Sequence, residues 1–98
     1  MEKLYFKVTQ KQYNALAGLR YRIADIHYQR EHGAAPAEIE KTDKTIQSLF
    51  DELDTLQVPF WVQNQTIASV ENYRRYYTEY TYQVLERVGV DCSEVSSR

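Results

Sequence analysis

Residues 36–56, PAEIEKTDKTIQSLFDELDTL, decide the fold. One set of side chains in this stretch recurs at alternating intervals of three and four residues, which places the set on one face of an α-helix. Its members are Ile39, Thr42, Ile46, Leu49, Leu53 and Leu56, with Phe50 beside them. Pro36 suits the first helical position, where its missing amide hydrogen is no loss, and Glu38 lies near the positive end of the helix dipole. The pattern predicts a helix over about residues 36–56.

A second amphipathic helix is predicted just before this one, over about residues 10–32. Its apolar face consists of Leu16, Leu19, Ile23 and Ile26. Thr9 and Gln12 form a capping-box pattern at its start, and Gly33 is a natural end because glycine adopts left-handed dihedrals without strain. Since only residues 33–35 link the two helices, we expect an antiparallel helical hairpin.

Charge and one glycine favour the pairing of these helices. Residues 1–33 hold six Lys or Arg and three Asp or Glu, whereas residues 34–58 hold two Lys and six Asp or Glu. Attraction between exposed rims is worth under ~1 kcal/mol per pair, so it orients the helices without driving folding. Gly18 costs the first helix about 1 kcal/mol relative to alanine and suggests close packing against a neighbour.

Two short strands are predicted on either side of the hairpin. Residues 3–8 alternate apolar and polar side chains with a period of two, which is typical of a strand. Residues 58–62, VPFWV, are apolar, and Pro59 restricts them to an edge strand or an extended segment. Because a hairpin separates the two stretches, any pairing between them is predicted to be antiparallel.

A third helix is predicted to begin between Asn64 and Val70 and to end near Val88 and Gly89. In an alternative interpretation, Asn64 and Gln65 form a hairpin turn and residues 66–70 form a third strand. The overall expectation is a mainly α protein, α+β in detail, with one small domain over residues 1–90. Residues 91–98 are polar, and we expect them to form a frayed tail.

Composition excludes several classes of protein. The chain has 98 residues, of which 43% are hydrophobic, and a net charge of -2. It is therefore neither a disordered segment nor a strongly basic nucleic-acid binder. A single cysteine allows no internal disulfide, no apolar run approaches the ~18 residues of a membrane helix, and no signal peptide is apparent. These features predict a cytoplasmic protein without a membrane segment.

Motifs for catalysis or metal binding are weak. His27 and Glu31 share a helical face, but His32 lies about 100° away around the helix, so we predict no metal site. Cys92 has acidic neighbours, which disfavour the thiolate that a nucleophile needs. With three glycines, the chain contains no phosphate-binding loop. We expect neither a cofactor nor enzymatic activity; an enzyme would need a pocket with convergent polar groups.

Two nucleic-acid hypotheses remain open as alternatives. Lys11, Arg20, Arg22 and Arg30 could contact phosphates, but Arg20 and Arg22 lie about 160° apart, whereas a phosphate track should be continuous. The acidic residues of the second helix could mimic a DNA backbone, and these are Glu38, Glu40, Asp43, Asp51, Glu52 and Asp54. Their ordinary interpretation is the solvated face of an amphipathic helix.

Tyrosine is the unusual feature of the sequence. There are nine, five of them at positions 73–82. On one continuous helix, Tyr73 and Tyr77 would join the apolar face and Tyr82 would point away from it. The partner-binding stripe would consist of Tyr76, Tyr80, Gln83 and Arg87, with Tyr82 and Arg75 on a neighbouring strip. Arg87 could stack on Tyr80. Tyrosine and arginine dominate protein–protein hot spots, although packing within the domain would also account for these rings.

The sequence therefore favours a non-enzymatic protein–protein interaction module that adapts or inhibits a larger machine. Small, mildly acidic domains of this kind are common among accessory proteins of phages and mobile elements, which is an association of size and composition. We also expect a homodimer, because a small core leaves Phe60, Trp61 and several tyrosines poorly covered. A nucleic-acid-associated or DNA-mimic regulator is the alternative.

Overall fold

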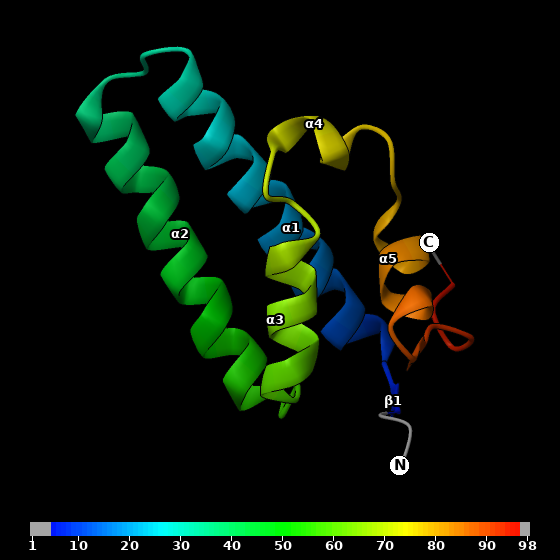
Figure 1. The fold of residues 1–98 in the computed structure, drawn as a ribbon. Coiled ribbons are helices and arrows are strands. Elements are labelled where there is room, and N and C mark those ends of the chain that lie inside the picture. The colour runs from blue at the N-terminus through cyan, green and yellow to red at the C-terminus, as the bar shows by residue number, and fades with distance from the viewer. Residues whose placement is uncertain (1–4, 97–98) are drawn as a thin grey trace.

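The predicted helical hairpin forms the frame of the protein. In the computed structural model, which describes residues 5–96, α1 (Gln10–Glu31) and α2 (Pro36–Thr55) run antiparallel and pack along their length (Figure 1). Thr9 and Gln12 make the predicted capping box: the Thr9 Oγ1 accepts from the Gln12 amide at 3.2 Å, and the Gln12 Oε1 accepts from the Thr9 amide at 2.9 Å. The predicted apolar face of α1 is fully buried. Leu53 is the most deeply buried residue of α2.

Gly18 lies on the hairpin interface, opposite Leu49. A methyl group at Gly18 would meet the Leu49 Cδ2 at 3.6 Å, which is an ordinary van der Waals contact. The helices are close here, as expected, yet their packing leaves room for alanine.

The strand predicted at residues 58–62 is wrong. The chain turns after α2 through Gln57, whose φ is 60°, and Pro59 then precedes α3 (Phe60–Ala68). The amides of Gln57 and Val58 donate to the carbonyls of Asp54 and Leu53, which is the hydrogen-bond pattern of a Schellman motif. A five-residue apolar run cannot distinguish strand from helix.

The predicted single third helix is also wrong. The chain instead forms three short helices, α3, α4 (Tyr73–Tyr76) and α5 (Thr81–Arg87). Asn64, expected as a helix start, lies inside α3, and Asn72 caps α4 by accepting from the Arg74 amide. The alternative strand at residues 66–70 is absent, because α3 continues to Ala68. The predicted end near Val88 is confirmed.

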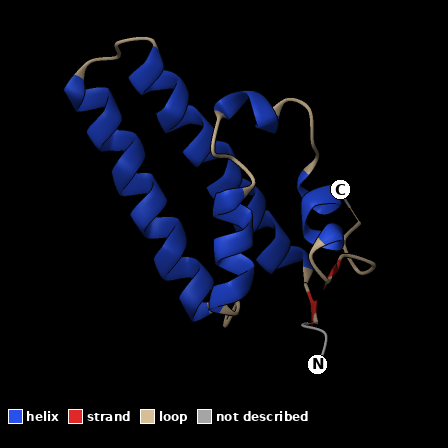
Figure 2. Cartoon of the chain, in the orientation of Figure 1, coloured by secondary structure: helices blue, strands red, loops and turns tan. Residues whose placement is uncertain are grey.

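The two strands of the described chain pair differently from the expectation. β1 (Phe6–Lys7) pairs with β2 (Val90–Asp91) in parallel, with Phe6 opposite Val90 (Figure 2). Residues 3 and 4 of the predicted first strand lie outside the described residues. The fold is therefore mainly α with one small sheet, although neither the partner strand nor its direction was predicted.

The segment expected to be a frayed tail contributes to the core. Cys92 and Val95 are buried, and the Ser96 amide donates to the Gln10 Oε1 at 2.8 Å. The polar residues between them hid this packing in the sequence. Residues 97 and 98 lie outside the described residues.

The hairpin divides the molecule into two sides. Figure 1 shows α2 on one side of α1, with α4 and α5 on the other. The tyrosine-rich segment at residues 73–82, which spans α4, the connection after it and the start of α5, therefore lies across α1 from the acidic helix α2.

Candidate functional site

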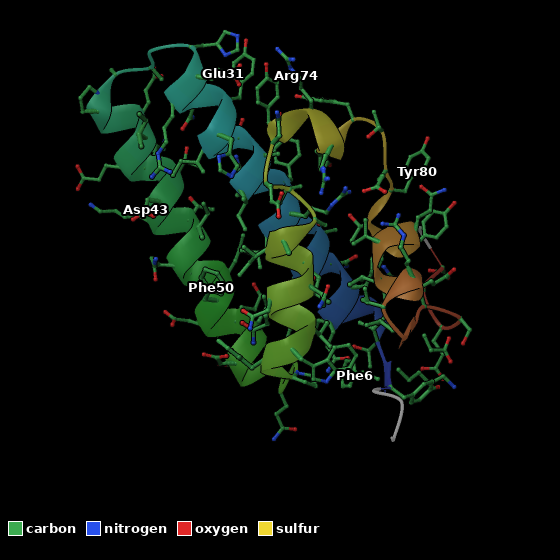
Figure 3. The ribbon with its side chains drawn as sticks, viewed as in Figure 1. Phe6, Glu31, Asp43, Phe50, Arg74 and Tyr80 are labelled. Carbon is green, nitrogen blue, oxygen red and sulfur yellow. The ribbon has the colours of Figure 1, made fainter. Side chains whose placement is uncertain are left out.

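The partner-binding stripe predicted on one helix is divided between two elements. Arg75 and Tyr76 lie in α4, Tyr80 lies in the connection that follows, and Gln83 and Arg87 lie in α5. Figure 3 shows Tyr80 projecting from this connection. The chain leaves the helical path between α4 and α5, so the stripe predicted on one continuous helix does not exist. Whether these residues bind a partner stays a prediction.

Local contacts fix the start of α5. The Tyr80 amide donates to the Gln83 Oε1 at 2.9 Å, so Gln83 is engaged as a helix cap. The Tyr80 ring is stacked with the Tyr82 ring, with centroids 5.9 Å apart and planes 12° apart. Tyr82, expected to point away from the core, is instead half-buried against it.

Arg87 does not stack on Tyr80. Its Nη2 lies 2.6 Å from the Glu79 Oε1 in an ion pair across the connection between α4 and α5. Arg75 is exposed, and within residues 5–96 its guanidinium forms no ion pair.

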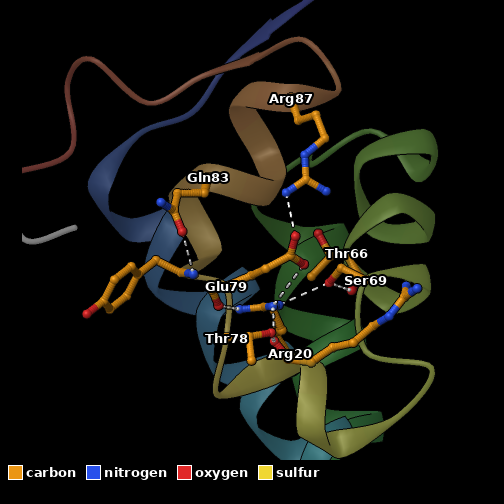
Figure 4. Close-up of polar contacts among 9 residues, drawn as sticks. Arg20, Thr66, Ser69, Thr78, Glu79, Gln83 and Arg87 are labelled. Atoms are coloured by element: carbon orange, nitrogen blue, oxygen red, sulfur yellow. Dashed lines mark hydrogen bonds and ion pairs between the residues drawn. The ribbon is translucent and has the colours of Figure 1, made fainter.

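A buried arginine organises this region. Arg20, on α1, is 1% exposed. Its Nε donates to the Ser69 Oγ at 3.0 Å and its Nη1 to the Glu79 carbonyl at 2.6 Å (Figure 4). Its Nη2 lies 3.5 Å from the Arg75 carbonyl and 4.0 Å from the Glu79 carboxylate. One guanidinium therefore joins α1 to the end of α3 and to both ends of the connection between α4 and α5.

Burial lowers the pKa of Arg20, and the nearby Glu79 carboxylate opposes that shift. Arginine keeps its proton in proteins, so the buried group remains a cation. The Tyr76 ring adds a favourable contact, because its centroid lies 5.2 Å from the Arg20 Cζ.

By sequence alone Arg20 is a candidate phosphate contact, but its burial excludes that role. A signal was present in the spacing. Arg20 follows Leu16 by four residues and precedes Ile23 by three, which places it inside the apolar face of α1. A charged residue in such a position is an indication of a buried polar network.

A cleft of about 380 Å³ opens beside the Arg20 network. Its lining residues come from α1, from the end of α4, from the connection after α4 and from the start of α5: Tyr13, Ala17, Arg20, Tyr76, Tyr77, Glu79, Tyr80 and Thr81. Tyr77 is 75% exposed and Tyr80 is 69% exposed. A second hollow of about 230 Å³ is lined by residues 76–80. The connection that carries Tyr77 and Tyr80 therefore forms a ridge bordered by two hollows.

Tyr77 is the residue that sequence reasoning missed. It was assigned to the apolar face, yet it is more exposed than any other tyrosine of the described chain. The helix that would have buried it ends at Tyr76, so the assignment failed with the helix.

Edge-to-face ring contacts hold α4 on α1. The Tyr21 and Tyr76 centroids lie 5.5 Å apart with an interplanar angle of 78°, and those of Tyr28 and Tyr73 lie 5.2 Å apart at 86°. Such pairs are worth about 0.5–1.5 kcal/mol beyond the area they bury. Part of the tyrosine cluster is therefore packing, whereas Tyr77 and Tyr80 remain largely uncovered.

The other candidate chemistries have separate places in the fold. Cys92 is buried, and His32 stacks on Tyr28 with centroids 4.0 Å apart. Among residues 5–96, no group of three or more His, Cys, Asp or Glu side chains is arranged to hold a metal ion. The six acidic side chains named on α2 are all exposed.

Comparisons with protein-family models, curated proteins and solved structures each returned no match to this chain. Within the described part of the chain, no helix combines the length and the apolar character needed to span a membrane.

Proposed function

We propose that this protein is a non-enzymatic interaction module that binds a protein partner through the cleft beside Tyr77 and Tyr80. It would act in the cytoplasm as an adaptor or an inhibitor of a larger assembly, a role typical of phage and mobile-element accessory proteins. The observation that carries the proposal is the pair of exposed tyrosines bordering a 380 Å³ cleft.

The physical argument rests on how these rings are held. A tyrosine has only two side-chain torsions, so fixing its ring in an interface costs little entropy. The backbone beneath the rings is anchored, because the Glu79 carbonyl accepts a 2.6 Å hydrogen bond from Arg20. A rigid aromatic surface beside a concavity is the arrangement in which a partner's side chain gains the most from burial.

The test compares two matched pairs of aromatic substitutions. Tyr77→Ala with Tyr80→Ala removes the exposed rings of the cleft, whereas Tyr5→Ala with Phe60→Ala removes exposed rings elsewhere; Tyr5 is 66% and Phe60 is 74% exposed. Proteins captured from an extract of the encoding organism are identified by mass spectrometry. A partner retained by the wild type and by the Tyr5/Phe60 variant, but not by the Tyr77/Tyr80 variant, supports the proposal. Equal retention by all three places the interface elsewhere.

A homodimer, predicted from the sequence because Phe60, Trp61 and several tyrosines have little to cover them, is a related proposal. Light scattering at micromolar concentration measures it directly. A dimer that becomes a monomer in the Tyr77/Tyr80 variant assigns the cleft to self-association, and a monomer at every concentration removes that proposal.

A further inference from the structure

The charged side chains around the cleft determine which kind of ligand it can bind. Arg20 lines the cleft, and Arg75 and Arg87 line a neighbouring hollow of about 260 Å³. Two carboxylates, Glu79 and Glu71, border the same two spaces. The site therefore carries one excess positive charge.

Arg75 is the side chain that can present this excess positive charge to a ligand. Glu79 is already engaged by Arg87 at 2.6 Å and lies 4.0 Å from Arg20. Glu71 lines the same hollow as Arg75 but makes no ion pair with it. The Arg75 guanidinium thus keeps its planar donor fork for an incoming group, and a carboxylate matches that fork in two parallel hydrogen bonds.

The distribution of charge along the chain also bears on which kind of ligand the cleft binds. Residues 1–33 carry +3, residues 34–58 carry -4 and residues 59–98 carry -1. Figure 1 places α2, which holds the acidic segment, across α1 from α4 and α5. An acidic ligand is therefore repelled most strongly from the α2 side.

We propose that the cleft binds an acidic peptide segment in which an aromatic or large aliphatic side chain stands within a few residues of an Asp or Glu. The apolar side chain enters the cleft between Tyr77 and Tyr80, and the carboxylate pairs with Arg75. Glu79 lines the cleft, Arg87 lines the hollow that also holds Arg75, and these two side chains lie 2.6 Å apart, so the two spaces are adjacent and both groups must come from nearby positions of the ligand. This inference rests on the proposed function and specifies the partner's chemistry.

A single-stranded nucleic acid is the competing ligand for a surface of tyrosines and arginines. The observations disfavour it, because most of the arginines here are paired. Arg22 lies 3.4 Å from Asp25, Arg74 lies 3.9 Å from Glu31, and Arg87 contacts Glu79. A phosphate track needs a continuous row of free cations, and the Glu79 carboxylate at the cleft repels phosphate.

The experiment selects ligands without assuming a sequence. A display library of random twelve-residue peptides is panned against the immobilised protein, and the best binders are synthesised with a fluorescent label. We expect peptides that combine Asp or Glu with an aromatic or large aliphatic residue. Arg75→Glu should weaken their binding about tenfold, because it replaces the matching cation by a like charge. Lys44→Glu makes the same charge change on α2, where Lys44 is 76% exposed, and should leave binding within twofold.

Every other outcome overturns the proposal of an acidic peptide ligand. The outcomes also show whether the proposed function fails together with it. Selected peptides that need Tyr77 and Tyr80 but are neutral or basic leave the proposed function standing and refute the acidic ligand. If a peptide of residues 36–56 binds as tightly as the best selected peptide, the occupant is a second copy of this chain. If an oligothymidine displaces the peptides at lower concentration, the surface serves nucleic acid. A library that yields no binder refutes the linear ligand, and the capture experiment then decides the proposed function alone.

Discussion

Replacing Arg20 by alanine is the most informative single perturbation of this fold. The substitution removes two short hydrogen bonds from a charged donor, to the Ser69 Oγ at 3.0 Å and to the Glu79 carbonyl at 2.6 Å. Such bonds contribute about 1.5–3 kcal/mol each. Removing a buried cation also removes its desolvation cost, which offsets part of the loss. We expect Arg20→Ala to lower the free energy of unfolding by about 3–5 kcal/mol.

That loss is large for a chain of this size, since small domains are stable by only about 5–15 kcal/mol. Urea denaturation followed by circular dichroism measures it. Arg22→Ala is the matched control: Arg22 lies on the same helix with a side chain 44% exposed, in an ion pair with Asp25 at 3.4 Å. An exposed pair is worth about 1 kcal/mol or less. If the two variants lose the same small amount of stability, Arg20 does not hold these segments together.

Three further predictions concern packing. Leu53→Ala should cost about 2–5 kcal/mol, because Leu53 is fully buried between the hairpin helices, and Leu49→Ala should cost less because Leu49 is half-buried; the two urea midpoints give the order. Gly18→Ala should raise stability by about 0.5–1 kcal/mol, since its methyl group would lie 3.6 Å from Leu49, and a lower melting temperature would show that the helices cannot accept it. Cys92, which is 1% exposed, should react with a thiol reagent only as the protein unfolds, and fast labelling in native buffer would show that the C-terminal segment is open.

The hairpin was predictable because its determinants are local. The apolar face of α1, the Thr9–Gln12 capping box and Gly33 each act within a few residues along the chain. Glycine readily adopts the positive φ found at Gly33, and Thr9 with Gln12 has the residue types and the spacing that form a capping box. Sequence reasoning recovers such elements well.

The breaks between α3, α4 and α5 were not predictable in the same way. No proline or glycine lies between Phe60 and Val88, so the strongest helix breakers are absent from that stretch. The Ser69 hydroxyl and the carbonyls of Arg75 and Glu79 lie at the breaks, and all three face the Arg20 guanidinium. One partner of the irregular backbone therefore lies about 50 residues away in the sequence, on another helix.

The incorrect prediction of one continuous third helix also affected the predicted arrangement of the candidate site. Helical periodicity exchanged the positions of two rings in the tyrosine-rich stretch: Tyr77 is exposed and Tyr82 is half-buried. Which ring is exposed depends on where the helix stops. The tyrosine-rich composition of this region can thus be read from the sequence, whereas the arrangement of its rings depends on the backbone path.

Arg20 connects the stability of the domain to the shape of its cleft. Its guanidinium lies near carbonyls at Arg75 and Glu79, which bracket the residues between them, and Tyr76 packs against it. An apolar residue in its place could fill the same volume, but it would remove the donor that Arg20 supplies to the Glu79 carbonyl and leave the connection freer to re-form helix. A continuous helix would turn Tyr77 toward the core and close the space beside Tyr80. Burying the Arg20 charge costs free energy in so small a domain. In return, the buried guanidinium maintains a fixed concave surface with the rings of Tyr77 and Tyr80 at its edge.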